Sequence, residues 1–100
     1  MNVEMIIPTL DNDGSDNTVT IESAIQSMCA MYGGATVFDA RGYWSNEAGR
    51  LYKDDVVVIR SASDNGKQNE ALRFLARRVL QVTDQEAVFI SIGGKAEIIE

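Results

Sequence analysis

Three residues at alternate positions, Asp39, Arg41 and Tyr43, form the strongest candidate for chemistry or binding in this sequence. Because side chains alternate across a strand, the three share one face if the strand is regular. Trp, Tyr and Arg are favoured anchors in protein interfaces, so this segment and the adjacent Trp44 predict a partner-binding surface. The alternative is an ion pair beside an aromatic edge of the core.

Other chemistry-bearing residues do not combine into a catalytic site. The chain has no histidine, the commonest general base and a frequent metal ligand. The only cysteine, Cys29, falls on the apolar side of a predicted helix, where we expect a buried and inert thiol. We therefore predict no catalytic residue, no cofactor and no metal. We leave open whether the chain is an enzyme, with a preference for a non-enzymatic protein.

A second candidate surface is the acidic loop at 11–18, which carries Asp11, Asp13 and Asp16. The first 40 residues hold six acidic residues and no basic one, whereas the other 60 hold nine of each sign. The whole net charge of −6 therefore comes from the first part of the chain. We expect the loop to form a negative lobe that steers the protein toward a basic partner. The alternative is a solvated loop without an electrostatic role.

The same loop partly fits a calcium-binding template. Asp11, Asp13, Ser15 and Glu22 fall at its positions 1, 3, 5 and 12. The template requires glycine at position 6, where this chain has Asp16, and no helix precedes the loop. A solvated acidic loop is the preferred interpretation.

Two helices are expected to support these surfaces. Apolar residues at helical spacing predict a helix at 21–32, with Thr20 as its cap and Gly33 as its stop. The same criterion predicts a second helix at 66–81. Three arginines of the second helix form a predicted basic stripe, for which solvation and docking of an acidic partner are the two interpretations: Arg73, Arg77 and Arg78.

Alternating and β-branched segments predict four strands, at 2–9, 35–44, 51–60 and 86–92. Residues 95–99 form a short fifth strand or a continuation of the fourth. Gly42 suggests a bulge or a close backbone approach in the second strand.

The order β-α-β-β-α-β predicts one α+β domain over residues 1–100. Its simplest solution is the ferredoxin-like sandwich, with a four-stranded antiparallel sheet and both helices on one face. The run Val56–Ile59 is apolar enough for a central strand. The open face must receive part of that run together with Ile6, Phe38 or Val37, and Phe89. Such a face is too apolar to stay bare, so we expect a homodimer or a protein partner.

Composition limits the cellular setting. An acidic surface repels phosphate, so we expect no direct nucleic-acid partner. No apolar run approaches the roughly 20 residues that span a bilayer, so we expect no membrane partner. The N-terminus lacks the pattern of a secretion signal and the lone cysteine has no internal disulfide partner. These features favour the cytoplasm.

The segment 34–44 also carries a family resemblance. Its pattern Gly-x-Thr-Val-x-Asp-Ala-x-Gly-x-Trp is formed by Gly34, Thr36, Val37, Asp39, Ala40, Gly42 and Trp44. With a Gln-Glu-Ala-Val segment at 85–88, it resembles a family of small bacterial and phage proteins known only as a domain of unknown function. The resemblance covers roughly residues 34–99 and implies a fold rather than an activity.

Taken together, the sequence predicts a small acidic, non-enzymatic module that self-associates or binds a partner protein. One variant is a phage-type inhibitor that occupies a basic surface on a nucleic-acid-handling complex. The alternative is a small dimeric ferredoxin-like enzyme or ligand-binding protein with a pocket near Asp39, Arg41 and Tyr43.

Overall fold

The computed structural model describes residues 1–64 and 66–100 and is α+β, as predicted. Asn65, predicted to end a loop, lies outside the described residues. The elements in chain order are β1 (Asn2–Pro8), α1 (Thr18–Tyr32), β2 (Thr36–Ser45), β3 (Leu51–Ala62), α2 (Asn69–Val82), β4 (Val88–Ile92) and β5 (Lys95–Ile99).

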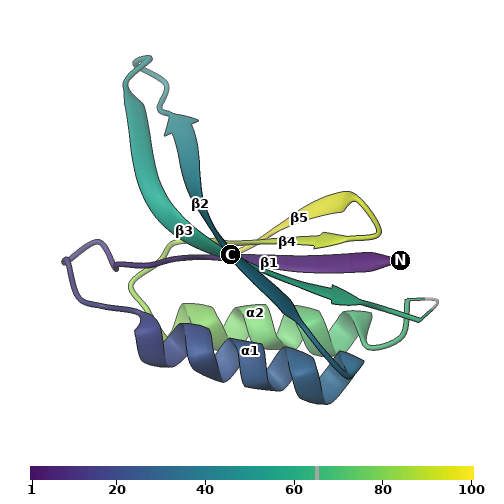
Figure 1. Cartoon of the computed structure of the whole chain (residues 1–100). Coiled ribbons are helices and arrows are strands. Elements are labelled where there is room, and N and C mark those ends of the chain that lie inside the picture. Colours follow the sequence, from purple (N-terminus) through teal and green to yellow (C-terminus); the bar gives the residue numbers. More distant parts are fainter. Residues whose placement is uncertain (65) are drawn as a thin grey trace.

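The strands form one antiparallel sheet in the order β2-β3-β1-β4-β5. Both helices lie side by side against one face of it (Figure 1). This arrangement is broadly compatible with the expected ferredoxin-like fold, but the predicted number of four strands is wrong. Gly93 and Gly94 both have positive φ, 58° and 83°, which suits a two-residue hairpin turn. The turn brings β5 back along β4 as a fifth strand at the edge.

Alternation along β1 builds the core between sheet and helices. Val3, Met5 and Ile7 are 0% exposed, as the sequence pattern predicted. From the helices, Met28 of α1 and Leu72 of α2 are also fully buried and belong to the same apolar cluster. Every second residue of β1 therefore faces the helices, and the residues between them face the other side of the sheet.

Helix α1 begins earlier than predicted. Asp16 Oδ1 accepts the backbone N–H of Thr18 at 2.6 Å, which satisfies a free donor at the start of the helix. The predicted cap, Thr20, therefore lies inside the helix. Its end is confirmed: Gly33 adopts φ 86° and donates its N–H to Cys29 O at 2.8 Å.

Two further expectations are wrong, and one of two alternatives is excluded. Cys29 is exposed, because Met28 rather than its neighbour points into the core. Of the bulge and the close backbone approach considered for Gly42, the bulge is excluded, since pairing between β2 and β3 is continuous from Thr36 to Ser45. Helix α2 starts at Asn69 rather than at 66, after Gln68 in the left-handed conformation with φ 68°.

The interior position of β3 gives a test of the fold. Residues 56–59 are 0–7% exposed and pair with β1 on one side and β2 on the other. We expect their amides to exchange among the slowest in the chain, and those of 42–45 much faster, because residues 42–45 pair on one side only. Exchange resolved by residue would measure this. Fast exchange throughout 56–59 would contradict the interior placement of β3.

Candidate functional site

The sheet face opposite the helices carries a row of apolar side chains that crosses all five strands. Cross-strand pairing joins these residues one after another: Phe38, Val58, Ile6, Phe89 and Ile98. We call them the apolar row. Phe38 is 39% exposed and Ile98 is 56% exposed, so the ends of the row reach solvent. Ile6, Phe89 and part of 56–59 lie on the open face as expected. Of the two alternatives Phe38 and Val37, Phe38 lies there, since Val37 pairs with buried Ile59.

A polar row lies next to it on the same face. Arg60 and Glu4 are cross-strand partners, with Nε–Oε2 at 2.7 Å and Nη2–Oε2 at 2.6 Å. The Arg60 guanidinium also lies over the Phe38 ring, 5.1 Å from its centroid. The two charges of the row compensate each other, so this face can approach another copy without net repulsion at the pair.

The outer part of the β2–β3 hairpin extends away from the helices (Figure 1). Its two strands are held by a tight turn in which Gly49, at φ 82°, donates its N–H to Asn46 O at 3.0 Å. Gly49 thus supplies the positive φ that this turn requires. Because this part of the hairpin stands outside the core, its side chains are available for contact on either side.

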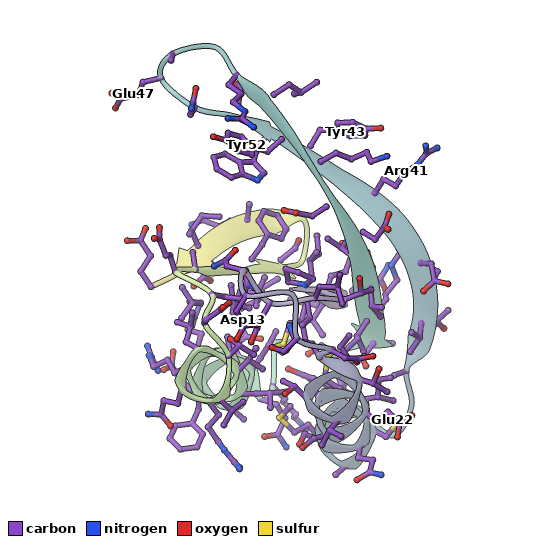
Figure 2. The ribbon with its side chains drawn as sticks, turned by 90° about the vertical axis from the view of Figure 1, so that its left-hand side faces the viewer. Asp13, Glu22, Arg41, Tyr43, Glu47 and Tyr52 are labelled. Atoms are coloured by element: carbon purple, nitrogen blue, oxygen red, sulfur yellow. The ribbon has the colours of Figure 1, made fainter. Side chains whose placement is uncertain are left out.

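One side of this hairpin carries an aromatic stack. Trp44 and Tyr52 are cross-strand partners with ring centroids 4.3 Å apart and an interplanar angle of 12°. Arg50 lies over the Tyr52 ring at 5.0 Å, and Trp44 Nε1 donates to Asp54 Oδ2 at 3.4 Å. Figure 2 shows Tyr52 on the side of the hairpin that overhangs β4 and β5. The stack therefore continues the open face beyond the apolar row.

The predicted trio lies on the opposite side of the hairpin. Asp39, Arg41 and Tyr43 share a face because the pairing has no bulge, and Figure 2 shows Arg41 and Tyr43 turned away from Tyr52. Trp44, predicted to act with them, points to the other side. A hollow of about 640 Å³ adjoins the trio and is lined by Thr9, Asp39, Ala40, Arg41, Asp55 and Val56. Tyr43 does not line this hollow, so only Asp39 and Arg41 of the predicted trio meet there.

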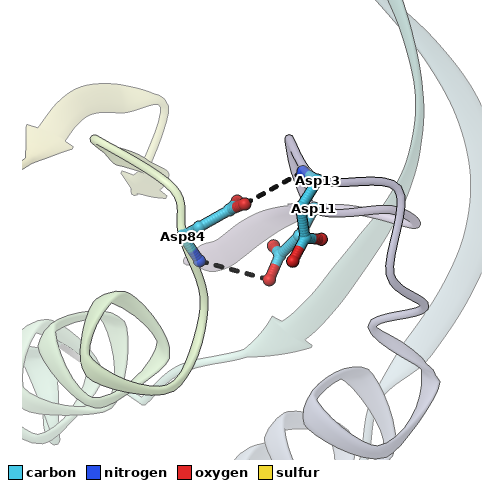
Figure 3. A group of neighbouring side chains, drawn as sticks. All are labelled: Asp11, Asp13 and Asp84. Carbon is cyan, nitrogen blue, oxygen red and sulfur yellow. Dashed lines mark hydrogen bonds between the residues drawn. The ribbon is translucent and has the colours of Figure 1, made fainter.

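The acidic loop is tied to the α2–β4 connection (Figure 3). Asp84 accepts the backbone N–H groups of Asn12 at 2.8 Å and Asp13 at 3.1 Å, and its own N–H donates to Asp11 Oδ2 at 3.2 Å. The carboxylate oxygens of Asp11, Asp13 and Asp84 lie within 4.8 Å of one another. The calcium template placed Glu22 beside Asp11 and Asp13, but in the structure Asp84 joins them and Glu22 lies on α1 (Figure 2). The hydrogen bonds of this acidic group to N–H groups indicate a structural link between the two connections.

These hydrogen bonds set the acid behaviour of the loop. Burial opposes ionisation of Asp11, yet hydrogen bonds from Asn17, Gln85 and Asp84 together hold its pKa below the ordinary value. Hydrogen bonds from Ser15 and Thr18 lower the pKa values of Asp13 and Asp16 in the same way.

A pH dependence of stability follows. A carboxyl with a lowered pKa stabilises the fold above its unfolded pKa, about 3.9, and loses that contribution as pH falls through the folded pKa. We expect the free energy of unfolding to fall below about pH 4, and to fall less steeply in Asp11→Asn. Urea unfolding across this pH range would measure it, with Glu47→Gln at the hairpin tip as the control. Equal slopes in Asp11→Asn and wild type would contradict the role of Asp11.

Sequence reasoning missed several residues of these surfaces. Tyr52 and Ile98 reach the open face only through strand register, and Asp84 meets Asp11 across 73 positions of the chain. Register at the hairpin carried a usable signal: once Asn46 and Arg50 are identified as the residues that close the turn, Trp44 must pair with Tyr52. No local pattern around Asp84 indicated its partners.

Within the described residues, no helix combines the length and apolarity needed to cross a membrane. No protein-family model matches the sequence, and no curated protein matches it. The resemblance to a family of unknown function stays a prediction.

Two solved structures are similar in fold. One is a phage SAM lyase in complex with S-methyl-5'-thioadenosine, with a TM-score of 0.64 and 16% identity over 97% of this chain and 84% of that one. The other is a phage SAM lyase in its apo state, with a TM-score of 0.63 and 14% identity over the same shares of the two chains. At these identities the likeness concerns the fold alone.

Proposed function

We propose that this protein is a ferredoxin-like association module, extended by β5, whose open sheet face binds a second copy of the chain. The observation that carries the proposal is the apolar row, which crosses five strands opposite the helices and continues into the Trp44–Tyr52 stack. Val58 in the middle of the row is only 6% exposed, so the surface offered to a partner consists of exposed Phe38 and Ile98, half-buried Ile6 and Phe89, and the stack. An exposed apolar band bordered by polar residues is typical of an interaction site.

The charge distribution on the open face favours a second copy of the chain as its partner. The net charge of −6 opposes self-association in general, whereas the polar row of the open face holds a compensated pair, Arg60 with Glu4. In a two-fold dimer the same patch contacts itself, so a face with matched charges and a continuous apolar row is self-complementary. The exposed stack then gives each copy an aromatic anchor for the other.

Sedimentation equilibrium at micromolar concentration tests this proposal. We expect a concentration-dependent mass of twice 11.0 kDa or a higher multiple. Ile98→Asp should shift the equilibrium toward the monomer, because it places a charge at the exposed end of the apolar row. A mass of 11.0 kDa throughout the concentration range would show a monomer and would reject self-association.

The phage-type inhibitor remains a finer version of this proposal. Its support is that both structural neighbours are phage proteins and that the chain is small and acidic. The negative loop would attract a basic partner through long-range charge, so association should slow as salt rises. Because Asp11 also holds the loop in place, salt dependence is a cleaner test of steering than substitution of Asp11.

A second candidate function is favoured by the ligand of one neighbour, S-methyl-5'-thioadenosine. The hollow beside Asp39 and Arg41 contains a further carboxylate, Asp55, and two carboxylates can accept hydrogen bonds from ribose hydroxyls. A positively charged sulfonium such as S-adenosylmethionine would also be attracted to an acidic chain. This candidate is the small-ligand or enzyme alternative of the sequence analysis.

Calorimetry with S-methyl-5'-thioadenosine and with S-adenosylmethionine separates the two candidates. A ligand-binding protein should show saturable heat that Asp39→Asn weakens, and an enzyme should in addition release S-methyl-5'-thioadenosine from S-adenosylmethionine. Absence of binding at millimolar ligand would exclude this second candidate. That result leaves self-association unaffected, since no residue of the apolar row lines the hollow.

A further inference from the structure

A groove lies between residues of α1 and α2. The two helices cover the sheet face opposite the open one (Figure 1). The volume of the groove is about 210 Å³, and it is lined by Val19, Thr20, Ser23, Ala24, Ser27, Leu75, Arg78, Val79 and Val82. The small side chains of α1 at 23, 24 and 27 leave room that larger residues would fill. Val19 and Val82 border it and are 83% and 66% exposed, so they add apolar surface at its rim.

The groove also holds a positive charge. Arg73, predicted to form a basic stripe with Arg77 and Arg78, is instead bound to Glu97 at 2.7–2.8 Å and to Glu70. Over residues 1–64 and 66–100, Arg77 and Arg78 form no ion pair. Both are exposed, but only Arg78 lines the groove. Of the predicted stripe, only Arg78 lies at the apolar groove, and Arg77 lies outside it.

We propose that this groove docks an acidic, amphipathic segment of a partner protein. An apolar side chain of the segment enters between Ser23 and Val79, and an adjacent carboxylate pairs with Arg78. Arginine suits this role because its planar guanidinium binds a carboxylate through two parallel hydrogen bonds. Burial of Val19 and Val82 beneath the segment removes apolar surface from water at the same time.

The charge of the rest of the chain shapes this recognition. The net charge of −6 repels an acidic segment at long range, but at physiological salt charges are screened beyond roughly 8 Å. Asp16 lies three residues before Val19 and Asp84 two residues after Val82, so the carboxylate of the segment is favoured at Arg78 and disfavoured beside Val19 and Val82. Glu22 lies about 100° around α1 from Ser23 and about 140° from Ser27, but only about 60° from Val19, so it shares a side of the helix with Val19 and not with the two serines. The site therefore selects acidic segments that fit closely and disfavours acidic chains that only approach.

Selection from a library of short random peptides against the whole chain tests the proposal. We expect enriched peptides to combine Leu, Ile or Phe with a nearby Asp or Glu. For the strongest synthetic peptide, Arg78→Glu should weaken binding about tenfold or more, and Ser27→Phe should weaken it similarly by filling the groove. Arg77→Glu is the matched control, because it makes the same charge change on the same helix outside the groove. We expect it to weaken peptide binding by less than about threefold.

Three outcomes would overturn the docking site: no enriched peptide, enrichment of basic peptides, or equal losses in Arg78→Glu and Arg77→Glu. Circular dichroism of each variant identifies any that fails to fold, and Ser23→Leu then replaces Ser27→Phe as the groove-filling variant. Peptide binding that Ile98→Asp abolishes while the groove variants retain it would place the segment on the open sheet face instead, and would also overturn the proposal.

Discussion

Replacement of Trp44 by Ala is expected to weaken association of the chain roughly thirtyfold, which corresponds to about 2 kcal/mol. Trp44 is 53% exposed in the single chain and stacks on Tyr52 at the overhanging side of the hairpin. In the proposed dimer its free surface is buried by the second copy, and interface tryptophans of this kind cost about 2 kcal/mol or more when truncated. Sedimentation of the variant over a range of concentrations measures the dissociation constant.

Tyr43→Ala is the matched control for this variant. Tyr43 is the preceding residue of the same strand, is 55% exposed, and points to the opposite side of the hairpin. We expect its loss to change the dissociation constant by less than about threefold, the usual range for a residue outside an interface. A larger loss for Tyr43→Ala than for Trp44→Ala would move the interface to the side of Asp39 and Arg41.

Replacement of Ile59 by Ala is expected to lower the free energy of unfolding by about 2–5 kcal/mol. Ile59 is 0% exposed, pairs with Met5, and belongs to the cluster that joins the sheet to both helices. Its truncation leaves a cavity that the surrounding strands cannot close. Since domains of this size are stable by only about 5–15 kcal/mol, the variant should unfold at markedly lower urea.

The control for this prediction is Ile98→Ala, at the exposed end of the apolar row. We expect it to change the stability of the monomer by roughly 0.5 kcal/mol, as most exposed substitutions do, while it weakens association. Unfolding followed at low concentration separates the two effects. If Ile59→Ala and Ile98→Ala destabilised the monomer equally, the helix-covered face would not be the core.

Elements with a strong local pattern were predictable from the sequence. The strand at 2–9 and the helix at 21–32 were predicted from alternation and from helical spacing. The same periodicities bury Val3, Met5 and Ile7 of β1 and Ile21, Ala24 and Met28 of α1. Their positions depend on side-chain periodicity alone, which one strand or helix displays without reference to the rest of the fold. The start of α1 was missed because Asp16 outside the helix supplies a hydrogen bond that spacing does not reveal.

Several residues of the open face could be predicted from the sequence, but their arrangement across the strands could not. Ile6, Phe38 and Phe89 were expected there, yet their union into one row depends on the register of four strand pairs. A shift of one residue in any pair would turn that strand's side chains to the helix side. The aromatic stack has the same origin: Trp44 was singled out for its type, whereas Tyr52 enters through pairing across the turn.

The acidic loop shows a different limit of sequence reasoning. Its composition predicted a solvated negative lobe, and composition alone gives no sign that Asp84 binds the backbone of Asn12 and Asp13. Contacts between residues more than 70 positions apart follow from the antiparallel pairing of β1 with β4, which brings the connection after β1 and the connection before β4 to one end of the sheet.

Trp44 is the only tryptophan of the chain, so its fluorescence reports directly on the surface proposed to associate. As protein concentration rises through the range in which sedimentation detects dimers, we expect the emission maximum to move to shorter wavelength and quenching by acrylamide to decline. Both changes follow from transfer of an exposed indole into an interface. Emission that stays characteristic of a solvent-exposed indole while the protein dimerises would contradict association through the open face and its aromatic stack.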